Sequence, residues 1–323
     1  MTRIEERSRE VWQWPVIETI WLDIKNALRQ LLKRKGVFMQ RHLSVKMTSV
    51  VCCVVLFPAA LQCRTRPAPL ATIPLEPYLR AQAIVHAVVN GKPGTFLFDT
   101  GEGVSSFSPS FAEKIGCHPW GRISGFRMSG ERLDNMHCDD ITFDLSGQKL
   151  LAPVVSTVDI MKFLGPDVPP VDGSLGLDLF AHQTITIIPR KAIVLESPSS
   201  LAERVKTARE LPIRIVRDVE GIALSVDGAV RTPGGLAWME LDSGNGGSLV
   251  VANHIAPLLG LPTDMTTPQP SHFELANGIT VEGTTRTRDL IMDGNIGAQF
   301  LNDWVLTLDL EHGRAWLASA ARG

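Results

Sequence analysis

The sequence predicts an all-β protein built from two similar lobes, with a short helix after a repeated acidic triplet in each lobe. The first observation is the repeat: Asp99-Thr100-Gly101 has a near copy, Asp242-Ser243-Gly244, in the second half, and each triplet ends an apolar run. The second is composition, since 27 glycines and 21 prolines suit a turn-rich β protein. A chain of 323 residues can also bury a large core.

A second motif is repeated downstream of each triplet. It reads Asp-Gly-Ser-Leu-Gly at 172–176 and Asp-Gly-Asn-Ile-Gly at 293–297. Each copy leads into a β-branched or apolar run, at 184–188 and 305–308. Because the period exceeds a hundred residues, the repeat indicates duplication of a lobe and not a solenoid.

A strand–turn–strand pattern precedes each triplet. Asn90-Gly91, the strongest short hairpin signal, joins apolar runs at 84–89 and 95–98. The second half repeats the pattern with a run at 222–226, a turn at Asp227-Gly228 and a strand that leads to the second triplet. The sequence therefore predicts that both acidic triplets follow a hairpin.

A short helix is expected after each triplet. Ser108-Pro109 provides an N-cap and a proline at the first helical position, and Gly116 marks the end of the first helix. The second helix is expected at 253–260, where Pro257 should make it short or irregular.

Each half also carries a candidate flap hairpin between its two motifs. The first turns at Ser129-Gly130 and the second at Asn277-Gly278. A hairpin that folds over a cleft would hold an extended peptide by main-chain hydrogen bonds and exclude water. The alternative for each is an ordinary surface hairpin. A proline-rich loop is predicted at 153–172, and it accounts for much of the greater length of the first half.

Four segments are expected along the chain. A linker at 197–212, with a short helix at 201–206, divides the lobes. The expected boundaries are 1–38 for a non-native or membrane-surface extension, 39–66 for a signal or lipoprotein-like segment, 67–198 for the N-terminal lobe and 199–323 for the C-terminal lobe.

These motifs resemble those of bacterial retropepsin-like aspartic proteases, with two units fused in tandem as the two lobes are in pepsin. The resemblance covers roughly residues 70–320. A lone Asp-Thr/Ser-Gly triplet is weak evidence, but two copies in the same context are strong. The resemblance implies the two-lobed, pepsin-like (acid protease) architecture, with Asp99 and Asp242 as the catalytic carboxylates.

Two carboxylates that meet between lobes suit acid–base chemistry. They cannot both ionise easily, so one keeps a proton and the other can act as a base. The resemblance also implies supporting roles for the rest of the triplets: hydrogen bonds across the lobe interface from Thr100 and Ser243, and a tight loop at Gly101 and Gly244.

The chain departs from the family pattern close to the two aspartates. The third position after each aspartate is Ser or Thr in pepsin-like enzymes and Ala in retroviral ones, but here it is Glu102 and Asn245. Glu102 would raise the pKa of the dyad by like-charge repulsion if it points inward. Glu240, two residues before Asp242, lies on the same face of the predicted strand. The single tyrosine, Tyr78, is not in either candidate flap.

The sequence therefore favours an aspartic endopeptidase that hydrolyses peptide bonds through a water activated by the dyad, with one aspartate per lobe. Its partner is a peptide or protein substrate, no metal or cofactor is expected, and a monomer should suffice because one chain supplies both halves of the site. The alternative is a catalytically inactive peptide-binding protein on the same fold. Glu102, Asn245 and the missing flap tyrosine motivate that alternative.

Other chemistries lack their sequence signals. A net charge of −2 gives no electrostatic footprint for nucleic acid. No phosphate-binding loop, Gly-x-Ser-x-Gly elbow or His-Glu-x-x-His pair is present. Asp172 and Asp293 are expected to cap backbone groups, whereas Asp139, Asp140 and Asp178 are expected to be solvated or strand-end charges.

The amino-terminal region indicates export to the periplasm or cell envelope. The apolar run 47–61 follows basic residues and is short for a membrane span. Cys63 lies in a lipobox-like context, which offers lipidation or ordinary signal cleavage as alternatives, and either Cys63 or the run itself would provide a membrane tether. Residues 1–38 read as a membrane-surface helix or as a consequence of a misplaced start codon, with translation beginning at Met39 or Met47.

Cys117 and Cys138 are the two cysteines in the body of the protein. In an exported protein they form a candidate disulfide. The alternative is two buried thiols that pack as small apolar side chains. The neighbouring His118 and His137 do not complete a recognised metal-ligand spacing.

Overall fold

The computed structural model describes residues 67–320 of the chain. The expectations for 1–38, 39–66, the 47–61 run and Cys63 fall outside these residues. Within 67–320, no helix combines the length and the apolar character that a membrane span requires.

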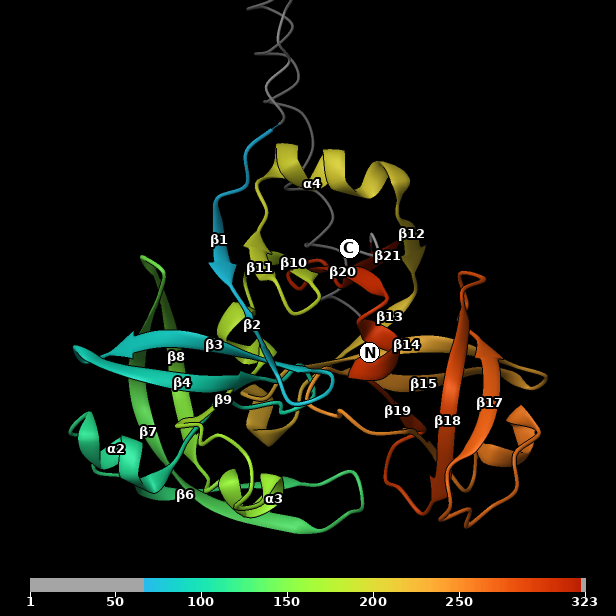
Figure 1. Ribbon diagram of the computed structural model, residues 1–323, viewed down its shortest axis with the longest axis horizontal. Helices are drawn as coiled ribbons and strands as arrows, with labels where there is room; N and C mark the ends of the chain where they lie inside the picture. The colour runs from blue at the N-terminus through green and yellow to red at the C-terminus, as the bar shows by residue number, and fades with distance from the viewer. Residues whose placement is uncertain (1–66, 321–323) are drawn as a thin grey trace, which may run out of the picture. The chain divides into compact units, whose positions relative to one another are not determined.

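The described residues form three β-sheets with a few short helices (Figure 1). The sheet of the N-terminal lobe has eight strands in the order β2-β3-β4-β9-β5-β8-β7-β6. These strands are β2 (Glu76–Tyr78), β3 (Gln82–Val89), β4 (Lys92–Phe98), β5 (Ser106–Phe107), β6 (Trp120–Phe126), β7 (Arg132–Leu145), β8 (Gln148–Thr157) and β9 (Gly173–Leu175).

The sheet of the C-terminal lobe has seven strands in the order β13-β14-β15-β19-β16-β18-β17. These strands are β13 (Ile213–Val216), β14 (Ser225–Thr232), β15 (Gly235–Asp242), β16 (Leu249–Ala252), β17 (Gln269–Glu274), β18 (Thr280–Arg288) and β19 (Gly294–Gly297).

The two lobes share one strand topology, as expected for a duplicated unit. In the first, β4 pairs in parallel with β9, β9 antiparallel with β5, and β5 in parallel with β8. In the second, β15, β19, β16 and β18 repeat the same sequence of parallel and antiparallel pairs. Both acidic triplets begin at the end of the equivalent strand, β4 or β15, so the duplication brings them to equivalent places.

A third sheet takes strands from both halves of the chain and joins the lobes (Figure 1). Its order is β1 (Ala71–Pro74), β11 (Ala192–Leu195), β10 (Thr184–Ile188), β20 (Trp304–Asp309), β21 (Arg314–Ser319) and β12 (Arg209–Leu211). At its centre the runs predicted after the two second motifs pair as β10 and β20, with Thr186 opposite Thr307. Their buried hydroxyls are 2.9 Å apart, which marks the axis that relates the two halves.

An aromatic cluster fills the core of the N-terminal lobe. The ring of Phe96 on β4 packs against the rings of Phe107, Phe111 and Phe143, with centroids 5.3 to 6.0 Å apart. All four side chains are buried. Burial of a phenylalanine side chain contributes roughly 1.5–3 kcal/mol, so this cluster fixes the strand that carries Asp99.

The short helices follow the predicted signals. The helix α2 (Pro109–Lys114) begins after Ser108, whose Oγ accepts a hydrogen bond from Phe111 N. The segment after the second triplet is the single 3₁₀ turn η4 (Ala256–Leu259), as the proline in it predicts. The linker contains α4 (Pro198–Arg204). The remaining short helices are α3 (Met161–Leu164), η1 (Leu177–Phe180), η2 (Val205–Thr207), η3 (Val219–Gly221) and α5 (Ala298–Leu301).

The turn predicted at Asp227-Gly228 is wrong, because both residues lie inside β14 and pair with Glu240 and Met239. A Cβ on Gly228 would lie 3.1 Å from Leu211 and 3.2 Å from Leu241. The glycine is therefore a packing requirement, and the chain turns later, between Thr232 and Gly235.

The predicted loop 153–172 is also only partly correct. Pro153 lies in β8. Its neighbours Ala152 and Val154 pair with residues of β7, but Pro153 itself has no partner in that pairing. The residue across the ladder, Asp140, has a φ of 51°. This local irregularity accommodates a residue that has no N–H to donate.

A disulfide joins Cys117 to Cys138 in the described structure, with Cα atoms 6.3 Å apart. It connects the end of the segment after α2 to the middle of β7. Of the two alternatives for these cysteines, the structure therefore contains the covalent pair.

Candidate active site

The two triplets meet between the lobes. Gly101 N donates to Asp99 Oδ1 at 2.9 Å, and Gly244 N donates to Asp242 Oδ1 at 2.8 Å. Each carboxyl lies against the triplet glycine of the other lobe, and the charge of Asp242 and hydrogen bonding with it raise the pKa of Asp99. The structure thus brings the two predicted carboxylates together, although 143 positions separate them in the sequence.

The hydroxyls of the two triplets cross below the carboxylates. Thr100 Oγ1 donates to Leu241 O at 2.5 Å and accepts from Ser243 N at 2.9 Å. Ser243 Oγ donates to Phe98 O at 3.0 Å and accepts from Thr100 N at 3.0 Å. Each hydroxyl binds the backbone of the opposite lobe, so the two loops hold one another in place.

The triplet glycines are required by a close approach between the lobes. A Cβ on Gly244 would lie 2.1 Å from Asp99 Oδ2, and a Cβ on Gly101 would lie 2.6 Å from Asp242 Cγ. Neither glycine has a left-handed backbone conformation. Their function is to make room for the opposite carboxylate, which is a different reason from the tight loop that the sequence predicts.

The dyad favours retention of a proton. Burial raises the pKa of Asp99 well above its usual range, and the charges of Asp242 and Glu102 raise it further. The hydrogen bond from Gly101 N opposes this rise. A carboxyl held protonated beside a second carboxyl is the arrangement that acid–base chemistry requires.

Glu102 points inward, because its Oε2 atom is buried, and its charge raises the pKa of Asp99. Burial raises its own pKa to about 8, while the nearby hydroxyls of Ser174 and Ser106 lower it and the charges of Asp178 and Asp242 raise it. Its Oε2 atom is buried without a hydrogen-bond partner. Burial thus favours the protonated form of Glu102 near the dyad.

The C-terminal lobe supports its aspartate through amides. Asn295 Nδ2 donates to Asp242 Oδ2 at 2.7 Å and to Glu240 Oε2 at 3.0 Å. Glu240 is 6% exposed, and its pKa is raised by burial and by the charges of Asp242 and Asp227. The strand position of Glu240 thus places a third carboxyl next to Asp242, on the face that the sequence predicts.

Asp178 corrects one expectation from the sequence. It is not a solvated charge, because Ser105 N donates to its Oδ2 at 2.9 Å and Ser105 Oγ donates to its Oδ1 at 2.7 Å. Burial raises its pKa to about 6 in spite of these hydrogen bonds. It lies at the start of η1, directly behind the loop that carries Glu102.

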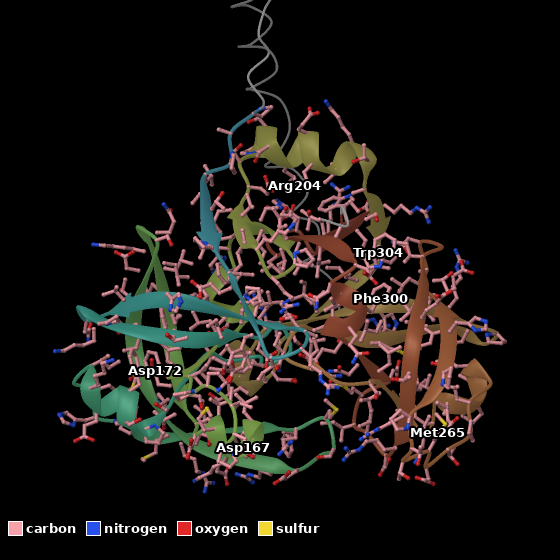
Figure 2. All side chains as sticks on the ribbon, in the orientation of Figure 1. Asp167, Asp172, Arg204, Met265, Phe300 and Trp304 are labelled. Carbon is pink, nitrogen blue, oxygen red and sulfur yellow. A yellow bond between two sulfur atoms is a disulfide. The ribbon has the colours of Figure 1, made fainter. Side chains whose placement is uncertain are left out.

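Asp172 and Asp293 bind backbone groups at equivalent places. Thr95 N donates to Asp172 Oδ2 at 2.9 Å, and Trp238 N donates to Asp293 Oδ2 at 2.8 Å. Asp172 lies among the strands of the N-terminal lobe (Figure 2). Each carboxylate fixes the strand that ends in a dyad aspartate, four residues beyond the bonded amide.

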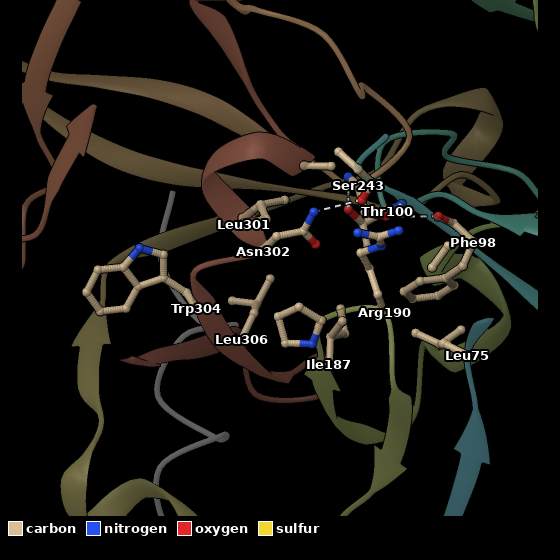
Figure 3. Close-up of a pocket in the computed structure, with 14 residues that line it drawn as sticks. Leu75, Phe98, Thr100, Ile187, Arg190, Ser243, Leu301, Asn302, Trp304 and Leu306 are labelled. Atoms are coloured by element: carbon tan, nitrogen blue, oxygen red, sulfur yellow. Dashed lines mark hydrogen bonds between the residues drawn. The ribbon is translucent and has the colours of Figure 1, made fainter. Parts of the chain in front are cut away.

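An apolar cavity of about 30 Å³ lies on the far side of the crossed hydroxyls (Figure 3). Thr100 and Ser243 form one wall, and the central sheet contributes Ile187 and Leu306. Phe300 and Trp304 lie close by, with ring centroids 6.0 Å apart (Figure 2). The crossed hydroxyls therefore border a small space that is lined mostly by apolar side chains.

The first candidate flap reaches the other lobe. Its tip is a turn in which Gly130 N donates to Arg127 O at 2.8 Å. Ile291 N, in the C-terminal lobe, donates to Met128 O at 3.0 Å, and the Arg127 guanidinium lies 4.8 Å from the centroid of the Phe163 ring. The hairpin that turns at Ser129-Gly130 therefore bridges the two lobes in this structure.

The second candidate flap lies elsewhere. Its turn at Asn277-Gly278 packs on its own lobe, where Ala276 N donates to Ala229 O at 2.8 Å and Leu275 pairs with Val230. This contact lies in the half of the β14–β15 hairpin that is remote from Asp242. Of the two hairpins, only the first spans the lobes.

The contact at Ile291 provides a test of flap closure. The variant Ile291→Pro removes the N–H that binds Met128 O, whereas Ile291→Ala keeps it. A single hydrogen bond contributes about 0.5–1.5 kcal/mol, so trypsin should cut the tip at Arg127 roughly 2- to 10-fold faster in the proline variant. The alanine variant should be cut at nearly the wild-type rate. Equal rates in both variants would show that this bond does not hold the flap.

Asn295 and Gln82 are site residues that the sequence analysis missed. Gln82 is buried and donates from Nε2 to Gly244 O. The signal for Asn295 was present: the second motif has an amide where its first copy has Ser174, and the register pairs Glu240 with Asn295. A buried carboxyl on one strand required a donor on the next.

Among residues 67–320, no group of three or more His, Cys, Asp or Glu side chains is arranged to hold a metal ion. The two dyad carboxyls accept hydrogen bonds from N–H donors.

Comparison with known proteins identifies the fold. No family model and no curated protein sequence matches the chain. The crystal structure of Basic 7S globulin from soybean is similar with a TM-score of 0.53 at 10% identity, over 79% of this chain and 96% of that one. The fold is two-lobed and pepsin-like. The structure of conglutin gamma, a unique basic 7S globulin from lupine seeds, has a TM-score of 0.48 at 11% identity, over 78% of this chain and 95% of that one.

Proposed function

We propose that this protein is an aspartic endopeptidase that uses Asp99 and Asp242 as its catalytic dyad. The observation that carries the proposal is the meeting of these two carboxyls, one from each lobe, above a pair of crossed hydroxyls. A pepsin-like fold by itself would not distinguish an enzyme from a binding protein.

The chemistry needs one proton and one water. In the first step the oxygen of the water bonds to the peptide carbonyl carbon, and the ionised carboxylate takes a proton from that water. The protonated carboxyl gives its proton to the carbonyl oxygen. In the second step the amide nitrogen is protonated, the diol loses a proton to the dyad and the C–N bond breaks. The products are a free carboxyl and a free amine, and the dyad again holds one proton.

A digest of a mixed peptide library at several pH values between 3 and 8 tests this function. We expect cleavage at internal peptide bonds, with new amino and carboxyl termini identified by mass spectrometry. The double variant Asp99→Asn/Asp242→Asn, purified in the same way, is the control for contaminating peptidases. If the wild-type protein yields no new termini at any pH, the proposed activity is wrong.

The alternative is a peptide-binding protein without turnover, and the carboxyl of Glu102 beside the dyad favours it. A groove needs its backbone and shape to bind a peptide, and not two ionisable aspartates. In that case Asp99→Asn would keep the wild-type peptide affinity, and the library would be recovered intact.

We further propose an exported protein of the periplasm or cell envelope, a monomer with a membrane tether through Cys63 or the 47–61 run. The disulfide between Cys117 and Cys138 supports export, since such bonds persist in oxidising compartments. Labelling with radioactive palmitate, compared between the wild type and Cys63→Ser, would test the lipid tether.

A further inference from the structure

A chain of two side-chain amides leads to Asp242: Asn295 binds the carboxylate, and Asn245 binds Asn295. Asn295 is fully buried, and its Nδ2 binds both Asp242 and Glu240. Its Oδ1 accepts a hydrogen bond from Asn245 Nδ2 at 2.8 Å. Because Oδ1 faces a donor, Nδ2 must face the two carboxyls, so the network fixes the orientation of the Asn295 amide.

The orientation of Asn245 is fixed in turn. Its Nδ2 also donates to Ser248 O at 3.2 Å, and its Oδ1 accepts from Gly247 N at 2.9 Å. Both ends of the amide are therefore engaged by backbone groups of the same loop. The hydrogen bonds of the two amides therefore form one continuous network from the loop backbone to the carboxylate of Asp242.

The two aspartates consequently receive different numbers of N–H donors. Asp242 accepts from Gly244 N and from Asn245 N, at 3.0 Å, on Oδ1 and from Asn295 on Oδ2. Within the part of the chain that the structure describes, Gly101 N is the one N–H group hydrogen-bonded to Asp99. N–H donors favour the charged form of a carboxylate, so the negative charge is better stabilised on Asp242.

The matching positions of the N-terminal lobe lack these amides. Leu97 pairs with Ser174 where Glu240 pairs with Asn295, and Glu102 occupies the place of Asn245 after the triplet. The N-terminal lobe thus has a carboxyl and a hydroxyl, Glu102 and Ser174, at the two positions where the C-terminal lobe has the amides of Asn245 and Asn295. The difference in hydrogen-bond donors between the two aspartates therefore arises at the positions where the two repeats differ in sequence.

We propose that Asn295, oriented by Asn245, is a positioning residue that keeps Asp242 ionised, so that Asp242 is the base of the dyad and Asp99 carries the proton. This assignment rests on the proposed function. In the first step the proton of the water passes to Asp242, and the proton of Asp99 passes to the carbonyl oxygen. In the second step Asp242 gives its proton to the amide nitrogen and Asp99 takes one from the diol, so the dyad returns to its starting state.

Several titratable groups face the dyad and enter its pH dependence. Glu102 faces it from the loop after β4, and Glu240 from β15. Asp178 lies beyond Glu102, and Asp227 on β14 lies beyond Glu240. All of these groups are acidic, and the Asn295 amide is a neutral donor that binds both Asp242 and Glu240.

The test is the variant Asn295→Ser, which installs the residue of the first lobe. The protein is labelled with [γ-¹³C]aspartate, and the unliganded dyad is titrated by NMR. Loss of a donor to the ionised form should raise the lower apparent pKa of the dyad by about one unit, a tenfold change. The acid limb of the pH profile of kcat/KM should move to higher pH by the same amount. Thr307→Ser, a buried polar change in the central sheet, should leave the lower pKa unchanged.

The NMR titration needs no turnover, so it judges the assignment even if no peptide is cleaved. An unchanged lower pKa in folded Asn295→Ser would overturn the proposal. If that variant does not fold, Asn245→Ser replaces it, because it frees the Asn295 amide from its partner and keeps the backbone N–H that binds Asp242. The same upward shift is expected there, and its absence would overturn the proposal equally.

Discussion

Raising the pH from 4 to 8 is expected to destabilise this protein, and Glu102 is expected to make a large contribution. The pKa of this carboxyl is about 8 in the folded protein, against a usual value of 4.5. Below pH 4.5 the group is protonated in both states. Between pH 4.5 and 8 the unfolded chain ionises while the folded chain does not, so stability falls as the pH rises.

The effect of Glu102 amounts to about 3–5 kcal/mol across this interval, at 1.36 kcal/mol for each unit of pKa difference. Four further carboxyls with raised pKa values act in the same direction, namely Asp99, Asp178, Asp227 and Glu240. The protein should therefore be most stable on the acid side of neutrality.

Urea unfolding at pH 4, 6 and 8 measures this dependence. We expect Glu102→Gln to unfold at nearly the wild-type urea concentration at pH 4 and at a clearly higher one at pH 8. Glu113→Gln, an exposed change on α2, is the matched control and should follow the wild type at all three pH values. A wild-type stability that rises between pH 4 and 8 would contradict the prediction.

The substitution Gly244→Ala is expected to lower kcat/KM for peptide hydrolysis by about 10²-fold or more. The added Cβ would lie 2.1 Å from Asp99 Oδ2 and 2.2 Å from Asp99 Cγ. These separations are far below van der Waals contact, so the two carboxyls must move apart. A misplacement on the order of 1 Å in a catalytic group costs about 10²-fold in rate.

Gly234→Ala is the matched control for this change. It lies in the exposed turn between β14 and β15, and the nearest atom to its Cβ would be Thr232 Oγ1 at 3.9 Å. Steady-state kinetics of both variants and the wild type on one peptide make the comparison. If Gly244→Ala retains the wild-type kcat/KM, the close approach of the lobes is not needed for activity.

The meeting of the dyad could be predicted because it follows from symmetry. Two copies of one strand–triplet unit, related by an axis, can bring their triplets together only near that axis. The pairing of Thr186 with Thr307 on the axis is the structural expression of this repeat. Features that depend on neighbouring residues alone could also be predicted. Examples are the helix start at Ser108 and the short helical turn at the proline of η4.

The remaining features depend on contacts between residues far apart in the chain. Gly228 resembles a turn residue, but its small size serves the packing of Leu211 and Leu241. Asp178 resembles a solvated charge until Ser105, 73 residues away, binds it. Asn295 gains its role from Glu240 and Asp242 on the neighbouring strand. No local pattern contains these partners.

Hydrolysis by the single variants Asp99→Asn and Asp242→Asn tests the central claim most directly. Each change removes one ionisable group and keeps the size of the side chain. The unfolding transition of each variant, measured with the disulfide intact, checks that the variant is folded. With a peptide that the wild-type protein cleaves, we expect each variant to lose about 10²-fold or more of the wild-type kcat. Cleavage at the wild-type rate by either variant would contradict a site in which each lobe supplies one catalytic carboxyl.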